Sequence, residues 1–178
     1  TTLTNATLLA NVLHETNGKL AVASDGSLQA KLYGGVSPGT AQRAETMVAK
    51  PLPGQRFRFG FKALATSEAQ NMFQIIGKPY NGKGLGFGAR DGRYYVQSDE
   101  EGAKPLDLGR VDGNWHTWDF DIYYAKGGKV DIRRDGALVG TYRGDFVRGQ
   151  TDARLRMGAY NISGKAATAR YRSVTLDG

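Results

Sequence analysis

Short segments in which apolar and polar side chains alternate one by one are the feature that most constrains the fold of this chain. Alternation of this kind puts successive side chains on opposite faces of an extended strand. It recurs at 57–63, 85–89, 118–123, 130–133 and 155–160. Helical spacing of apolar residues is limited to 4–13 and 67–71. Many short strands of this type bury their apolar faces by stacking two sheets, so we expect an all-β protein.

Two Asp-Gly dipeptides indicate where neighbouring strands form hairpins. Asp91-Gly92 separates 85–89 from 94–97, and Asp135-Gly136 lies just after 130–133. Asp-Gly between alternating segments is a strong hairpin signal. No Pro/Ser-rich linker, charge block or repeat divides the chain. We therefore predict one antiparallel β-sandwich domain over residues 1–178.

Composition excludes several kinds of chemistry. The chain has no cysteine, which rules out disulfides, thiolate metal sites and a cysteine nucleophile. No apolar run approaches the roughly 20 residues of a membrane helix. The first residues, Thr1 to Asn5, lack the charged and apolar segments of a signal peptide. We interpret the chain as the mature form of a secreted or periplasmic protein that does not bind membranes.

A net charge of +7 favours an anionic partner. Nucleic acid, an acidic glycan and an anionic surface all fit, and so does a basic protein whose cations are merely scattered. The chain carries no helix-turn-helix, zinc or RNA-recognition motif, which argues against nucleic acid. The positions of the cations along the strands must therefore decide.

The segment 154–161 carries an unusual polar row. Its core-facing side chains are apolar, and Arg154, Arg156 and Tyr160 share the other face. Gly158 leaves a gap in that row, where a ligand can approach the backbone. Two cations and a phenol in one row are unusual for a face that only meets solvent.

Two further strands add polar side chains to an open face. Arg43 and Glu45 alternate with apolar residues in 42–48, and Gln74 interrupts an apolar run in 71–76. Arg43 and Glu45 form either a plain surface ion pair or a site in which Glu45 holds Arg156 for an anionic ligand. Gln74 alone is compatible with a solvated residue.

The glycine-rich segment 77–84 is either an ordinary hairpin loop or a flap over a binding site. Its Lys78 and Tyr80 are residue types that contact sugars. The sequence does not distinguish these two interpretations.

Taken together, the segments 42–46, 74–76 and 154–162 resemble the jelly-roll polysaccharide lyases of the alginate-lyase and glucuronan-lyase type. That family carries an Arg-x-Glu-Leu strand, a Gln-x-His strand and a strand close to Tyr-Phe-Lys-Ala-Gly-x-Tyr-Asn-Gln. The segment 113–136 resembles the wider concanavalin A-like sandwich. The resemblance implies a jelly-roll fold and a lyase that cuts polyuronates such as alginate or glucuronan by β-elimination.

The resemblance also implies roles for individual residues. Arg43 and Gln74 match the positions that neutralise the uronate carboxylate, and Tyr160 matches the catalytic tyrosine. An adjacent arginine favours the phenolate, so we expect the neighbouring arginines to lower the pKa of Tyr160. Arg156 matches a lysine that grips a substrate carboxylate. We assign further residues to substrate binding as well: Arg154, Glu45, Asn161, Lys78, Tyr80, Lys31 and Tyr33.

One position departs from the family pattern. Ile76 stands where the family has histidine, and isoleucine cannot carry a proton. His116 follows Trp115 in a structural context, and His14 lies in the irregular N-terminal segment. Three alternatives remain open: Tyr160 works alone, another strand supplies a partner such as Lys31 or Tyr33, or the domain only binds.

We therefore predict a secreted polysaccharide lyase, with a non-catalytic carbohydrate-binding module for acidic glycans as the alternative. A glycoside hydrolase needs two facing carboxylates. Asp119 and Asp121 share a face that we assign to the opposite sheet, which leaves Glu45 alone. We expect a monomer that requires no cofactor. A structural calcium ion held in part by Asp119 and Asp177 stays open, although no loop has a recognisable calcium spacing.

Overall fold

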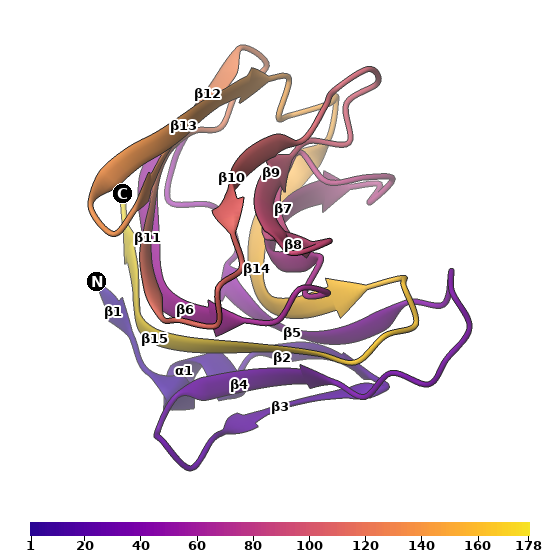
Figure 1. Ribbon diagram of the computed structural model, residues 1–178. Helices are drawn as coiled ribbons and strands as arrows, with labels where there is room; N and C mark the ends of the chain where they lie inside the picture. The colour runs from indigo at the N-terminus through magenta and orange to yellow at the C-terminus, as the bar shows by residue number, and fades with distance from the viewer.

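The computed structural model describes residues 1–178 as two antiparallel sheets packed face to face (Figure 1). In chain order the elements are β1 (Thr2–Leu3), α1 (Asn5–Leu9), β2 (Val12–Thr16), β3 (Gly18–Val22), β4 (Leu28–Leu32), β5 (Gln42–Ala49), β6 (Arg56–Ala65), β7 (Asn71–Lys78), β8 (Leu85–Arg90), β9 (Arg93–Gln97), β10 (Leu106–Arg110), β11 (His116–Tyr123), β12 (Gly128–Arg134), β13 (Ala137–Gly144), β14 (Thr151–Asn161) and β15 (Ala167–Asp177). The predicted all-β sandwich is confirmed.

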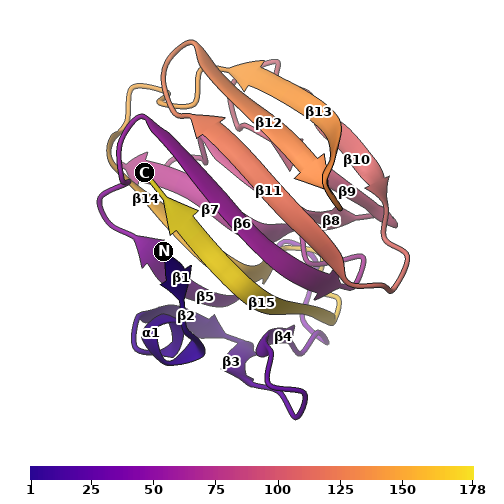
Figure 2. The ribbon, with the colours of Figure 1, turned by 90° about the vertical axis from the view of Figure 1, so that its left-hand side faces the viewer.

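The two sheets differ in composition and role. An eight-stranded sheet has the order β13-β12-β11-β6-β15-β4-β3, with β1 beside β15, and it faces the viewer in Figure 2. A seven-stranded sheet has the order β10-β9-β8-β7-β14-β5-β2. Its central strands, β7, β14 and β5, come from distant parts of the chain. They are the strands in which the sequence shows polar rows.

Both predicted hairpins form. Asp91 and Gly92 connect β8 to β9 with φ values of 52° and 76°, and Asp135 and Gly136 connect β12 to β13 with 53° and 85°. Positive φ at both central residues is what the twist of a two-residue hairpin requires. The helical interpretation of 67–71 is wrong, because Asn71 already begins β7. Only α1 is helical, and the structure contains no helix with the length and apolarity to cross a membrane.

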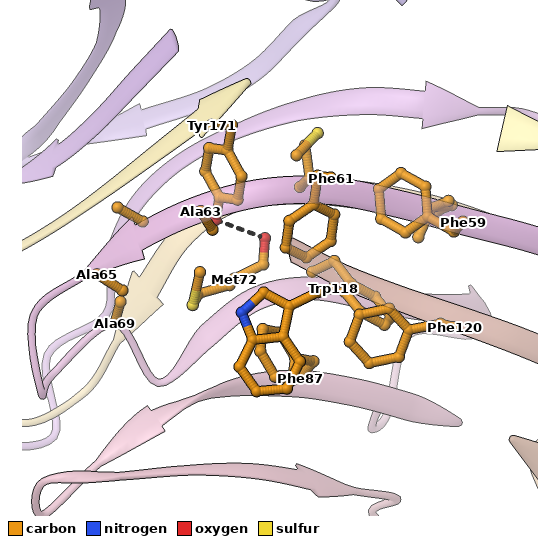
Figure 3. Close-up of a cluster of buried hydrophobic side chains, with 14 of the residues drawn as sticks. Phe59, Phe61, Ala63, Ala65, Ala69, Met72, Phe87, Trp118, Phe120 and Tyr171 are labelled. Carbon is orange, nitrogen blue, oxygen red and sulfur yellow. Dashed lines mark hydrogen bonds between the residues drawn. The ribbon is translucent and has the colours of Figure 1, made fainter. Parts of the chain in front are cut away.

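The core lies between the sheets and is rich in aromatic rings (Figure 3). Phe73 of the seven-stranded sheet meets Phe120 of the eight-stranded sheet at a centroid distance of 4.7 Å. Phe87 lies at the same distance from Trp118. Aromatic side chains bury roughly 150–250 Å² each, so these rings contribute a large part of the apolar area buried between the sheets. The alternation in the sequence therefore predicts the core-facing residues correctly.

One polar group reaches through this core to the other sheet. The ladder between β14 and β7 pairs Met157 with Phe73 but Tyr160 with Asn71, so β14 contains an extra residue at this point. Gly158 in this bulge has a φ of 144°. The hydroxyl of Tyr171, from β15, lies within hydrogen-bond distance of the carbonyl oxygens of Gly158 and Met72, 3.1 Å from the latter (Figure 3). Its one hydroxyl proton supplies a donor to these buried carbonyl oxygens at the bulge.

We expect the substitution Tyr171→Phe to lower the free energy of unfolding by about 1–3 kcal/mol, because it leaves buried carbonyl groups without a donor. Tyr33→Phe is the matched control, since the Tyr33 side chain is exposed and its hydroxyl makes no hydrogen bond. Urea unfolding of both variants provides the measurement. Equal stability of the two variants would contradict this account of the bulge.

Candidate active site

A cavity of about 460 Å³ lies on the outward face of the seven-stranded sheet. Its wall includes Arg43 of β5, Gln74 of β7, and Arg156 and Tyr160 of β14. The structure thus brings together the four residues that the sequence singles out on three separate strands. They meet because β14 pairs with β5 on one side and with β7 on the other.

Strand register decides which side chains are neighbours. Tyr160 is opposite Arg43 on β5, and the Arg43 guanidinium carbon lies 5.0 Å from the centroid of the Tyr160 ring. Arg156 is opposite Gln74 on β7. Directly opposite residues on one face of a sheet have Cβ atoms about 5 Å apart. A guanidinium, a carboxamide and a phenol therefore border one cavity.

Glu45 lies beneath this group with only 2% of its side chain exposed. Its Oε2 accepts a 2.8 Å hydrogen bond from Gln74 Nε2, and its Oε1 lies 3.7 Å from Arg43 Nη1. The first bond spans β14 at Gly158, so the gap that the sequence assigns to a ligand is bridged by the protein itself. Burial raises the pKa of Glu45, and the hydrogen bond from Gln74 and the nearby arginines oppose that rise.

Arg156 is the least compensated charge in the site. The residue is 9% exposed, makes no ion pair or hydrogen bond with any protein group, and its Nε has no partner. Burial lowers its pKa, which Glu45 partly offsets. Leaving a desolvated cation unpaired costs free energy of folding. The arrangement is suited to an anionic ligand that pairs with the guanidinium.

Tyr80 forms another part of the cavity wall. Its backbone has a φ of 64°, and its ring lies 5.5 Å from the guanidinium carbon of Arg156 and 5.3 Å from that of Arg154. Left-handed backbone is unusual for a bulky side chain. Arg154 itself does not border the cavity; it is buried, and its Nε donates to the Asp152 carbonyl at 3.5 Å.

The glycine-rich segment is held firmly to its neighbours. Gln150 Nε2 donates to Asn81 Oδ1 at 2.9 Å and to the Gly82 carbonyl at 2.8 Å, while its Oε1 accepts from the Gly77 amide. These bonds favour one of the two interpretations, an anchored hairpin loop that presents Tyr80, and they argue against a mobile flap.

Four other residues assigned to substrate binding lie outside the cavity. Asn161 is fully buried and bonds to Gln42 and to backbone carbonyls, which is a structural arrangement. Lys78 is exposed and pairs with Asp152 at 3.3 Å. Lys31 lies on β4 and Tyr33 just after it, in the other sheet, and both are exposed. The structure does not bring these four residues to Tyr160.

Ile76 borders the cavity opposite Arg154, so the position that resembles the family's histidine is apolar. The chain's own histidine near the site comes from β2. His14 is opposite Glu45 in register, and burial together with Arg43 and Arg156 lowers its pKa. His116 is 2.7 Å from the carboxylates of both Asp112 and Asp135, away from the site. His14 is therefore neutral at pH 7 and lies one strand beyond Arg43 and Glu45.

The electrostatics of Tyr160 differ from the expectation. Burial raises its pKa, Arg43 lowers it and Glu45 raises it, with burial the largest effect. The net direction is upward, opposite to the one that the sequence suggests. The phenol is thus protonated at neutral pH in the free protein.

More than half of the residues in the cavity wall are ones that the sequence analysis did not select as site residues. Among them are Asn71 of β7, Lys83 just before β8, Tyr95 of β9 and Asp99 just after β9. Lys83 Nζ pairs with Asp99 Oδ1 at 3.0 Å, and the Lys83 stem lies over Gly86. The alternation of glycines in β8 was a signal for this part of the wall, because strand glycines often mark places where other groups approach the backbone.

Comparison with known structures places this geometry in context. The endo-β-1,4-glucuronan lyase of the fungus Trichoderma reesei is 17% identical, with a TM-score of 0.69 over 93% of this chain and 89% of that one. The chain has the fold of this lyase. The alginate lyase of Klebsiella pneumoniae is 10% identical, with a TM-score of 0.64 over 97% of this chain and 88% of that one.

The same sandwich also occurs in a protein of a different kind. The binding domain of botulinum neurotoxin serotype C1 is 12% identical, with a TM-score of 0.61 over 93% of this chain and 43% of that one. No protein-family model and no curated protein sequence matches the chain. At these identities the comparisons establish the jelly-roll fold, and the activity must be argued from the site.

We predict that His14 titrates below the ordinary histidine value of 6.5 and that Arg43→Gln raises its pKa. A neighbouring cation disfavours the imidazolium, so removing that cation favours protonation. Arg110→Gln is the control, because Arg110 is exposed on the far edge strand β10. NMR titration of the imidazole signals, assigned with His14→Gln, measures both shifts. An unchanged titration in Arg43→Gln would refute the electrostatic effect of Arg43 on the pKa of His14.

Proposed function

We propose that the chain is a polysaccharide lyase that cleaves an acidic, uronate-containing polysaccharide such as alginate or glucuronan by β-elimination. The observation that carries the proposal is the nearly buried, unpaired Arg156 beside Gln74, in one cavity with Arg43 and Tyr160. The shared fold with lyases whose names specify alginate and glucuronan adds support.

The chemistry explains why these residue types are needed together. In β-elimination the C5 proton leaves, a C4–C5 double bond forms, and the C4–oxygen bond breaks. While the carboxylate at C5 is ionised, the C5 proton is only weakly acidic. Neutralising the charge of that carboxylate makes the proton more acidic. Arg43 and the free N–H of Gln74 would bind this carboxylate and stabilise the charge that develops on it. Arg156 would hold a carboxylate of the same polysaccharide next to this site.

Tyr160 is the group that would move the proton. Its phenolate takes the C5 proton, and the resulting phenol returns that proton to the leaving C4 oxygen, so the enzyme ends as it began. Both transfers lie on one side of the sugar. Because burial raises the pKa of Tyr160, only a small fraction of the free protein is in the reactive phenolate form near neutral pH.

A non-catalytic module for acidic glycans is the second candidate. The apolar Ile76 at the position that resembles the family's histidine favours it, and the fold also occurs in a toxin binding domain. Such a module would use Arg156 and Arg43 in the same way and would form no product. The experiment below separates the two candidates.

We predict that the wild-type protein forms unsaturated products from a polyuronate and that Tyr160→Phe abolishes product formation while binding persists. The phenyl ring keeps the packing against Arg43 but cannot carry a proton. Ultraviolet absorbance of the new double bond reports cleavage, and calorimetry with a uronate oligomer reports binding. Tyr123→Phe, on β11 of the eight-stranded sheet, is the control. Binding without product by the wild type would support the module instead.

We also predict that kcat/KM rises with pH through neutrality and beyond, because the reactive phenolate belongs to a group whose pKa is raised above 10.0. A base with the lowered pKa of His14 would instead give a profile that levels off below pH 6.5. The pH profile of wild type and of His14→Gln measures the difference. A wild-type kcat/KM profile that levels off below pH 6.5, together with a His14→Gln profile that does not, would assign the base to His14.

A further inference from the structure

Asn71 stands at the start of β7, directly opposite Tyr160 on β14. It borders the cavity, and only 8% of the residue is exposed. Tyr160 is therefore flanked in the sheet by Arg43 on one side and by Asn71 on the other. The spacing of cross-strand neighbours puts the carboxamide within reach of any sugar that Tyr160 contacts.

The Asn71 side chain makes no hydrogen bond within the protein. Its Oδ1 is buried and has no partner, and no bond is formed by its Nδ2. Buried carboxamides are normally hydrogen-bonded, so this one is kept at a cost to stability. An unpaired polar side chain beside a proposed catalytic tyrosine points to a partner that arrives with the ligand.

The surroundings of Asn71 leave it available. A Cβ at Gly86 would lie 3.0 Å from Asn71 Oδ1, so the neighbouring strand gives it a glycine surface without a donor. Lys83, whose stem crosses the same glycine, already pairs its Nζ with Asp99 at 3.0 Å. Neither neighbour therefore satisfies the carboxamide.

We propose that Asn71 is a substrate-contacting residue that hydrogen-bonds a ring hydroxyl of the uronosyl unit on which Tyr160 acts. The inference rests on the proposed lyase function. Arg43, Arg156 and Gln74 are the groups that bind carboxylates, and Gln74 lies opposite Arg156 on β7. Asn71 lies three residues before Gln74, at the start of β7 and opposite Tyr160, where it is left to meet a hydroxyl. A carboxamide matches a hydroxyl because each can both donate and accept.

The test compares Asn71→Ala and Asn71→Asp with the control Asn114→Asp, which lies on an exposed loop. We expect Asn71→Ala to lower kcat/KM on a polyuronate about tenfold, the loss of one well-placed hydrogen bond. Its Tm stays equal to that of the wild type or rises, because an unsatisfied buried group is removed. Asn71→Asp lowers kcat/KM further, since its charge repels the uronate, and Asn114→Asp leaves kcat/KM unchanged.

A second readout does not depend on cleavage. In the Tyr160→Phe background, Asn71→Ala should raise the Kd for a uronate oligomer. Unchanged kcat/KM and unchanged Kd in Asn71→Ala would overturn the proposal, and so would a Tm that falls in step with activity, which indicates a structural role. If the wild type binds the uronate oligomer but does not cleave the polyuronate, the lyase proposal fails. The Kd comparison then decides whether Asn71 contacts the ligand. A wild type that does neither overturns both.

Discussion

The site depends on one buried contact, the hydroxyl of Tyr171 against the bulged backbone where β14 and β7 meet. A bulge breaks the regular ladder and leaves carbonyl groups that water cannot reach. The Tyr171 phenol from the opposite sheet reaches two of these carbonyls through the aromatic core and supplies one donor. The bulge in turn brings Asn71 opposite Tyr160, although Phe73 and Met157 pair two residues away. The geometry of the site therefore depends on the packing of the core in this sandwich.

Around that bulge, the outward face of the seven-stranded sheet carries several polar groups whose burial lowers the stability of the fold. Arg156 is nearly buried without a partner, Asn71 makes no hydrogen bond, and Oε1 of Glu45 accepts no hydrogen bond. Proteins that carry such groups generally do so for function, since apolar replacements would be more stable. The unpaired donor of Arg156 fits a carboxylate, and the unpaired acceptor of Asn71 fits a hydroxyl. A uronate sugar supplies both within one residue.

The same environment constrains the chemistry. Burial protects the charges of the cavity from water and strengthens their interaction with a carboxylate. It also raises the pKa of Tyr160, so one burial effect favours substrate binding and disfavours the phenolate. Arg43 opposes that rise from 5.0 Å away. With Ile76 in the wall in place of a histidine, no imidazole borders the cavity, and Tyr160 is the phenol that lies opposite Arg43.

The sequence by itself determined the strands with clear alternation, both Asp-Gly hairpins and the core-facing residues of those strands, because alternation and turn chemistry are local properties of the chain. It missed strands at both ends of the chain, including β2 with His14, which the sequence analysis assigned to an irregular segment, and β15. It also identified Arg43, Gln74 and Tyr160 as facing one side. It could not find Asn71, because strict alternation from Gln74 assigns Asn71 to the core face and only the bulge turns it outward. Strand order places β14 between β5 and β7, and it places β2 beside β5, which brings His14 next to Glu45. Pairing between distant strands depends on how the whole core packs, and therefore only the tertiary structure decides it.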